Sequence, residues 1–197
     1  MIKHNIRIFA YCIIGLAFIT YIVISLFTQD LQAINWYKAL INISTTISIN
    51  IFFWVVFTLF IWKWKIFHPW LVKTPNLNGN WTGTIISNWE GGNKEPIMTT
   101  LTITQNFFSC QVGIKTGESK SYSLSSSFNI DKERGLNQLL YTYLNTPKPG
   151  VRDRSEIHYG TAILNLENIK TNTIDGEYWT SRETTGELKL ERTMPNK

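Results

Sequence analysis

Two uncharged apolar runs open the chain, and short alternating segments follow them. The first run covers residues 8–27, and the second covers residues 39–62. A helix that rises ~1.5 Å per residue crosses the ~30 Å hydrocarbon layer of a membrane with ~20 residues, so each run is long enough to span it. A signal peptide is the rival interpretation of the first run. Its apolar region has only ~7–15 residues and ends at a small-residue cleavage site, which is missing here.

The short connection between the runs predicts a transmembrane hairpin, and its second helix has a polar half. Asn42, Ser44, Thr45, Thr46, Ser48 and Asn50 crowd that half. Residues 52–62 are nearly all apolar. Polar groups in hydrocarbon need partners, so they face another helix or a water-filled space. The pattern favours a helix-packing seam, and a pore lining is the alternative.

Charge predicts the orientation of the hairpin. Basic residues stand at both of its ends: Lys3, Arg7, Lys63, Lys65 and Lys73. Because basic residues concentrate on the cytoplasmic side, we expect both ends in the cytoplasm. The net charge of +5 belongs to residues 1–75, since residues 76–197 have 13 basic and 13 acidic residues. This balance does not support binding to DNA or RNA, which takes a basic face that neutralises many phosphates.

Residues 76–197 alternate between strand-like segments and turns. Eight such segments follow one another with no helical period between them: residues 80–89, 97–105, 107–116, 120–130, 138–145, 156–166, 173–182 and 186–193. Eight strands in simple succession close into a small barrel with room for one small ligand. The expected fold is therefore that of a membrane protein. An N-terminal two-helix transmembrane hairpin, with a linker to residue 75, precedes an all-β, eight-stranded antiparallel small β-barrel.

Candidate catalytic and metal chemistry is sparse. The chain has two cysteines and three histidines that lie far apart: Cys12, Cys110, His4, His68 and His158. These spacings indicate neither a disulfide framework nor a zinc site. We find no nucleophile elbow and no phosphate-binding glycine motif. We therefore expect no enzyme activity and no metal.

A ligand site is the stronger hypothesis, because residues two apart on a strand share a face. Polar and aromatic candidates gather in the last four strands and one loop: Tyr141, Tyr143, Asn145, Arg152, His158, Tyr178, Thr180 and Arg182. Facing inward, they offer rings that stack on bases, groups that bond to base edges and a guanidinium for phosphate. Arg152 and Arg154 lie in the loop of residues 147–155, which is a candidate lid. The alternative is that the tyrosines fill the barrel and the arginines face solvent.

Several motifs follow the helix hairpin in a fixed order. LNGNWTG stands at residues 77–83, YTYLN at residues 141–145 before Pro147, and GEYWTSR at residues 176–182 before Gly186. This layout resembles the SMODS-associated effectors that have two transmembrane helices and a β-strand-rich domain. They belong to CBASS, the cyclic-oligonucleotide-based anti-phage signalling systems of bacteria. The resemblance covers nearly the full length of the chain.

The resemblance implies an antiviral effector in the bacterial inner membrane. Its cytoplasmic barrel would bind a cyclic dinucleotide made by an infection-sensing nucleotidyltransferase. The effector would then oligomerise and disrupt the bilayer, which kills the infected cell before the phage spreads. The eight candidates above would bind this activating ligand, and no other cofactor is implied. Five polar residues of the second helix would act in oligomerisation or membrane disruption: Asn42, Ser44, Thr45, Ser48 and Asn50.

Two alternatives remain at the level of the sequence. A membrane-tethered barrel that carries a lipid or another apolar ligand would have an apolar interior and no need for Arg182. A structural scaffold would use Trp81, Trp89 and Trp179 to dock a partner.

Overall fold

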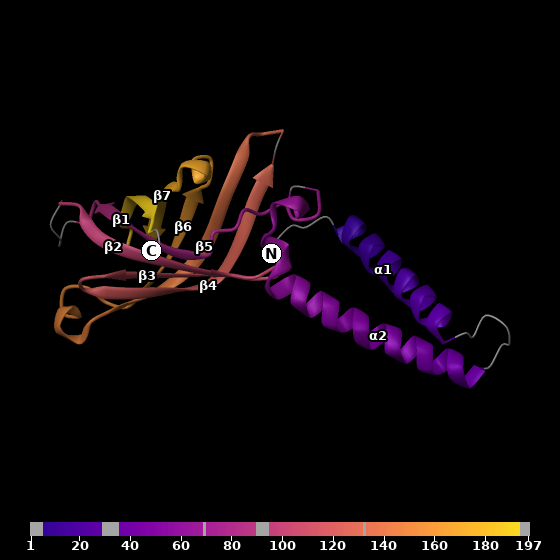
Figure 1. The fold of residues 1–197 in the computed structure, drawn as a ribbon. Coiled ribbons are helices and arrows are strands. Elements are labelled where there is room, and N and C mark those ends of the chain that lie inside the picture. The colour runs from indigo at the N-terminus through magenta and orange to yellow at the C-terminus, as the bar shows by residue number, and fades with distance from the viewer. Residues whose placement is uncertain (1–5, 29–35, 69, 90–94, 132, 194–197) are drawn as a thin grey trace. The chain divides into compact units, whose positions relative to one another are not determined.

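The computed structural model describes residues 6–28, 36–68, 70–89, 95–131 and 133–193. Contacts divide the chain into two compact units, one within residues 3–74 and one that runs from residue 75 onward. The first unit has two long helices, and the second is a closed barrel of eight antiparallel strands (Figure 1). The predicted fold class is therefore confirmed.

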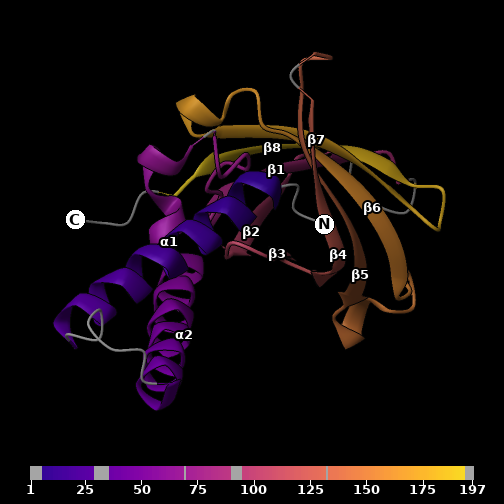
Figure 2. The ribbon, with the colours of Figure 1, turned by 90° about the vertical axis from the view of Figure 1, so that its right-hand side faces the viewer.

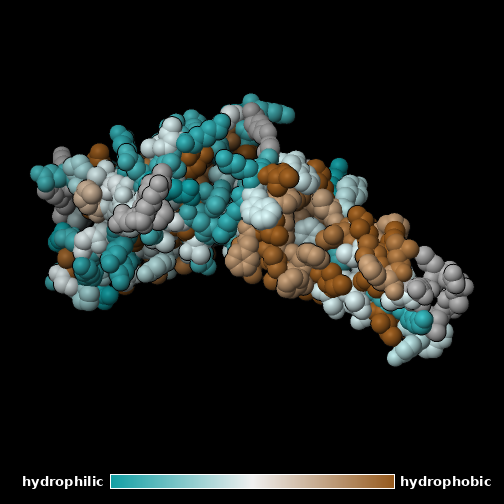
Figure 3. Space-filling model, viewed as in Figure 1, coloured by the Kyte–Doolittle hydropathy of each residue, from teal (hydrophilic) through white to brown (hydrophobic). Residues whose placement is uncertain are grey.

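The two helices, α1 (Ile6–Phe27) and α2 (Trp36–Leu59), are each long and apolar enough to cross a membrane. Hydrophobic residues, drawn in brown, cover much of their surface (Figure 3). The predicted range of the second helix was residues 39–62, so the observed helix begins three residues earlier and also ends three residues earlier. Lys38 stays in the helix because a single lysine does not break one. At the other end, the backbone of Phe60 leaves the helical region with φ −126°.

Polar residues spaced four apart join α2 to α1. Asn42, Thr46 and Asn50 are buried along one face of α2. The side-chain amide of Asn42 donates to Thr28 Oγ1 at 3.1 Å, and that of Asn50 donates to Thr20 Oγ1 at 2.8 Å. These bonds agree with the favoured interpretation of a helix-packing seam, and both of them lie within one hairpin.

The other polar residues of α2 have a different environment. Ser44, Thr45 and Ser48 are exposed on this unit. Thr45 Oγ1 donates to the carbonyl of Ile41, and Ser48 Oγ donates to the carbonyl of Ser44. The hydroxyls of Thr45 and Ser48 are thus satisfied by their own helix, while all three side chains face outward. The part that the five polar residues play in oligomerisation stays a prediction.

The barrel consists of β1 (Gly79–Ser87), β2 (Ile97–Gln105), β3 (Cys110–Thr116), β4 (Ser119–Asp131), β5 (Leu136–Pro147), β6 (His158–Asn165), β7 (Thr173–Thr180) and β8 (Thr185–Arg192). Each strand pairs with the next, and β8 returns to pair with β1. Figure 2 shows the strands from a second direction. Closure leaves no free strand edge, which protects the sheet from pairing with other chains.

The apolar core fills one end of the barrel. Inward residues change character along a strand: on β5 they run from Leu139, fully buried, through Tyr141 and Tyr143 to Asn145. On β6, Leu164 lies in the core, and the inward residues toward the other end are small or polar. The core therefore leaves the end near Asn145 open for a cavity.

Residues 75–78 close the end that holds the core. Gln105 Nε2 donates to the carbonyl of Pro75 at 3.1 Å, and Gln105 Oε1 accepts from the backbone N–H of Leu77 at 2.8 Å. Arg192 donates to the carbonyl of Asn78 at 2.7 Å, with its guanidinium 4.9 Å from the centre of the Trp81 ring. Access to the interior is therefore from the opposite end.

Candidate ligand-binding cavity

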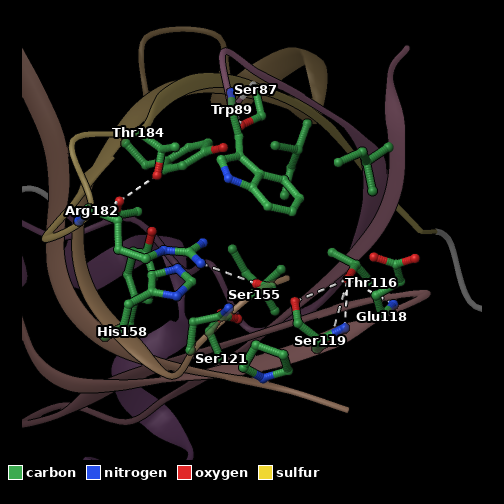
Figure 4. A pocket seen from close by; sticks show the side chains of 18 of the residues that line it. Ser87, Trp89, Thr116, Glu118, Ser119, Ser121, Ser155, His158, Arg182 and Thr184 are labelled. Atoms are coloured by element: carbon green, nitrogen blue, oxygen red, sulfur yellow. Dashed lines mark hydrogen bonds between the residues drawn. The ribbon is translucent and has the colours of Figure 1, made fainter. Parts of the chain in front are cut away.

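A cavity of about 510 Å³ occupies the open end of the barrel (Figure 4). Its walls come from inward residues of every strand and from the turns that join β3 to β4 and β7 to β8. Cavities that enclose small ligands in proteins have volumes of roughly 300–1,000 Å³. This one is therefore large enough for a ligand of drug or dinucleotide size.

Two tyrosines of the cavity wall depend on glycines of neighbouring strands. Tyr143 is paired with Gly160, and Tyr178 is paired with Gly186. A Cβ atom at Gly160 would lie 2.4 Å from Tyr143 Cζ, and one at Gly186 would lie 2.5 Å from Tyr178 Cε1. Each ring therefore lies over a position without a side chain. Tyr141 extends this aromatic wall, since its ring centre is 5.8 Å from that of Tyr143.

Arg182 reaches the cavity from the turn between β7 and β8. The backbone N–H of Thr180 donates to the carbonyl of Thr184 at 2.9 Å, which closes the turn. Glu183 takes a left-handed conformation, with φ 61°, that lets the chain reverse. The hydroxyls of Thr180 and Thr184 bond to each other, and the backbone N–H of Arg182 donates to Thr180 Oγ1 at 3.3 Å. The two threonines thus hold the turn that presents the guanidinium.

The charge of Arg182 is not neutralised by a carboxylate within salt-bridge distance among the described residues. Its guanidinium lies 5.6 Å from the centre of the Trp89 ring, and Nη1 donates to Ser155 Oγ at 3.4 Å. Its Nε is buried without a hydrogen-bond partner in the described part of the chain. Figure 4 shows these groups facing one another across the cavity. An anion that enters therefore meets a cation with unused donors.

Burial sets the protonation of the neighbouring groups. Burial lowers the pKa of His158, the hydrogen bond between its Nδ1 and the carbonyl of Glu156 at 2.8 Å opposes this, and Arg182 lowers it further. The imidazole is therefore neutral at pH 7. Burial also raises the pKa of Tyr141, whose hydroxyl is enclosed without a hydrogen-bond partner among the described residues. An unsatisfied buried hydroxyl is costly, so a ligand oxygen or nitrogen at this point would stabilise it.

Comparison with known proteins bears on this cavity. Residues 72–192 match the family model described as Cap15, cyclic dinucleotide receptor domain. The chain belongs to the Cap15 family. The CD-NTase-associated protein 15 of Staphylococcus schleiferi is 32% identical over 151 residues, 76% of this chain and 78% of the relative. The protein of the same name from Escherichia albertii is 30% identical over 170 residues, 85% of this chain and 84% of the relative.

These matches confirm the family resemblance that the sequence motifs indicated. The barrel is the cyclic dinucleotide receptor domain of the Cap15 family, and a cyclic dinucleotide is the activating ligand that this domain implies. The match covers the strands that form the cavity, and it begins after both apolar helices. Among the described residues, no group of three or more metal-ligating side chains lies close enough to hold a metal ion.

The Cap15 barrel brings together seven of the eight predicted site residues. Those that line the cavity are Tyr141, Tyr143, Asn145, His158, Tyr178, Thr180 and Arg182. Arg152 is the exception. Pro149 begins a one-turn helix in the loop, after which Arg152 turns back and its Nε donates to the carbonyl of Pro147 at 3.3 Å. Arg154 lines the cavity instead, paired with Glu118.

Sequence reasoning missed part of the wall. Ser87, Ser121 and Trp89 line the cavity from β1, β4 and the segment after β1. Ser121 pairs with Asn145, and this register between β4 and β5 is not readable from the alternation of one strand. Nothing local marks Trp89. Of the tryptophans proposed to dock a partner, Trp81 is fully buried, which removes it from an outer docking surface.

Proposed function

We propose that this protein is the membrane-bound effector of a CBASS system, and that its barrel cavity binds a cyclic dinucleotide made by a partner nucleotidyltransferase. Binding leads to self-association and disruption of the inner membrane, which kills the infected cell. The protein acts as a receptor and not as an enzyme. The observation that supports this best is Arg182, a cation that lies beside an aromatic wall and has no carboxylate within salt-bridge distance among the described residues.

The chemistry of a cyclic dinucleotide suits these groups. Its bases stack on flat rings, which Tyr143 and Tyr178 present, and stacking on an aromatic side chain contributes roughly 1–3 kcal/mol per base. Its phosphates pair with a guanidinium, which Arg182 offers. The amide of Asn145 suits base edges. The lining also has apolar residues, so the carrier of an apolar ligand remains the alternative that the test must separate.

The membrane part supports the second half of the proposal. Both apolar helices would cross the inner membrane with the two chain ends in the cytoplasm. Asn42 and Asn50 hold the hairpin together, whereas Ser44, Thr45 and Ser48 face outward. The oxygens of the Thr45 and Ser48 hydroxyls, whose protons bond within the helix, can still accept hydrogen bonds from helices of other copies once the hairpins are concentrated. A ligand drives this step only if it binds the assembled state better than the separate one.

The test uses the full chain in detergent micelles, with cyclic di-GMP, cyclic di-AMP, cyclic GMP–AMP and linear mononucleotides as probes. Arg182→Ala is compared with Arg134→Ala, an exposed arginine in the turn between β4 and β5. We expect at least one cyclic dinucleotide to raise the unfolding temperature of the unaltered chain and of Arg134→Ala. The shift should disappear in Arg182→Ala.

Equal shifts in both variants would remove Arg182 from the site. Stabilisation by fatty acids, with no effect of any nucleotide, would support the carrier of an apolar ligand instead. In cells that make the activating nucleotide, we expect Arg182→Ala to reach the membrane and yet leave the cells alive.

A further inference from the structure

Two cross-strand pairs of like charge lie on the outer surface of the barrel. Lys115 on β3 is opposite Lys120 on β4, and Glu177 on β7 is opposite Glu187 on β8. All four side chains are exposed. Like charges directly opposite each other destabilise a sheet. The isolated barrel therefore has one unfavourable basic pair and one unfavourable acidic pair.

None of these four residues forms an ion pair within 4.0 Å in the described part of the chain. The two pairs also lie on opposite walls. In the closed strand order, β3 and β4 are separated from β7 and β8 by two strands on each side. Figure 2 shows β7 and β8 along the upper wall of the barrel and β3 along the lower one.

The two pairs lie near the same end of the barrel, next to the cavity. Lys115 and Lys120 flank the turn between β3 and β4, and Glu177 is three residues from the last residue of β7. Exposed apolar side chains accompany each pair. Tyr122 and Leu124 follow Lys120 along β4. Beside the acidic pair, Ile86 is directly opposite Glu187, and Trp179 follows Glu177 on the same side of β7.

We propose that these two faces bind each other between copies, so that the barrels join head to tail in an open row. The basic face consists of Lys115, Lys120, Tyr122 and Leu124, and the acidic face consists of Ile86, Glu177, Trp179 and Glu187. The inference rests on the self-association in the proposed function and specifies its interface. Each lysine pair then meets a glutamate pair, which relieves the repulsion within both.

The placement of the faces selects this arrangement. Faces on opposite walls make a contact between different surfaces of two copies, which extends as a row unless it closes into a ring. Both pairs lie near the same end of the barrel, so two barrels with parallel axes present the two faces at similar height along those axes. A two-fold dimer about an axis parallel to the barrel axis would instead set lysines against lysines or glutamates against glutamates, and such juxtaposition is unfavourable.

The cavity connects the two faces. Glu118, in the turn that follows Lys115, and Arg182, in the turn between β7 and β8, both line it. The hairpins that form the walls of the site are thus the hairpins that present the charged pairs. A ligand that contacts both turns restricts their relative motion and so lowers the entropy lost when copies join. This links occupancy of the cavity to assembly.

The experiment measures assembly of the full chain in detergent micelles by sedimentation, with the cyclic dinucleotide that stabilises it most. One variant has Lys115→Glu with Lys120→Glu, so both faces are acidic. A second has Glu177→Lys with Glu187→Lys, so both faces are basic. For each variant alone, we expect the protein concentration at which half of the chains are assembled to rise at least about tenfold. The reason is that like charges replace opposite ones at every contact.

Charge complementarity makes two rescues possible. An equimolar mixture of the two variants should assemble like the unaltered chain, since each acidic face then finds a basic one. The chain with all four substitutions exchanges the faces and should assemble alone. Because the substituted residues lie outside the cavity, every variant should keep its unfolding temperature and its nucleotide-induced shift. A lowered unfolding temperature identifies a variant that fails to assemble only because it fails to fold. If this happens to the variant with Lys115→Glu and Lys120→Glu, the neutral pair Lys115→Gln with Lys120→Gln replaces it.

The outcomes separate the interface from the proposed function. If both double variants assemble like the unaltered chain, the interface is wrong and the receptor function stands. If both fail and neither rescue restores assembly, the head-to-tail pairing of these faces is wrong. If the unaltered chain binds a nucleotide but never assembles, the proposed self-association is wrong and the interface with it.

Discussion

Gly160 is the position where one added methyl group tests the geometry of the cavity most directly. A Cβ atom there would lie 2.4 Å from both Cζ and Oη of Tyr143 and 2.9 Å from the carbonyl oxygen of Trp179. Carbon atoms in contact are ~3.5–4.0 Å apart, so Gly160→Ala forces the tyrosine ring away from the wall. The carbonyl is part of the β7 backbone and yields less easily than the ring.

The size of the effect follows from these contacts. Overpacking a well-packed site costs about 1–3 kcal/mol, and we expect a loss of unfolding free energy in this range. A displaced Tyr143 no longer stacks on a base. Because such stacking contributes roughly 1–3 kcal/mol, affinity for the activating cyclic dinucleotide should fall by about 5- to 160-fold.

The assay combines thermal unfolding with nucleotide titration of the full chain in micelles. Gly150→Ala is the matched control, since a Cβ there meets no atom within 4 Å. A double variant separates the two effects. Gly160→Ala with Tyr143→Leu removes the clashing ring but leaves the contact with the Trp179 carbonyl, so it should regain part of the lost stability without regaining affinity. If Gly160→Ala melts and binds like Gly150→Ala, the wall does not depend on the pairing of Tyr143 with this glycine.

Three further predictions concern the cavity and the hairpin. Tyr141→Phe removes a buried hydroxyl that has no partner among the described residues, so stability should stay within about 1 kcal/mol while nucleotide affinity falls. The lowered pKa of His158 means that the unfolded chain takes up a proton first on acidification. The contribution of His158 to the free energy of unfolding is therefore complete above pH 6.5, the ordinary pKa of histidine, and is lost as the pH falls below that value. Asn42→Leu with Asn50→Leu removes two bonds between α1 and α2, so dye leakage from liposomes should fall while nucleotide binding remains.

Each of these has its own check. For Tyr141→Phe, unchanged affinity in a titration would show that the hydroxyl does not meet the ligand. For His158, unfolding temperatures from pH 8 to pH 5 should converge for the unaltered chain and His158→Gln, and parallel curves would contradict the assignment. For the asparagine pair, unchanged leakage at equal membrane content would remove the seam from the mechanism.

Much of the architecture follows from local patterns. The lengths of the two uncharged runs predicted both helices, because crossing hydrocarbon sets a minimum length that needs no tertiary contact. The predicted range of α2 was three residues too late at both ends, because the absence of charge does not decide where a helix begins or ends. Strand parity placed Tyr141, Tyr143 and Asn145 on one face, because successive side chains of a strand always alternate.

Tertiary structure decided what those patterns leave open. Parity does not say which face of a strand is inside, and register between strands depends on packing partners far away in the sequence. The pairing of Tyr143 with Gly160 is one such choice. The separation of Arg154, in the cavity wall, from Arg152, outside it, is another, and it depends on the turn that begins at Pro149.

Closure of the barrel had the largest consequence. Pairing of β8 with β1 brings the segment around Trp89 beside the turn of Arg182, about 90 residues later, so an arginine and a ring meet that no local pattern connects. It also sets the basic and acidic pairs on opposite walls. The sequence by itself determined that two helices long and apolar enough to cross a membrane precede a strand-rich domain. Only the closed sheet determined the shape of the cavity, because its walls come from strands spread over the whole domain.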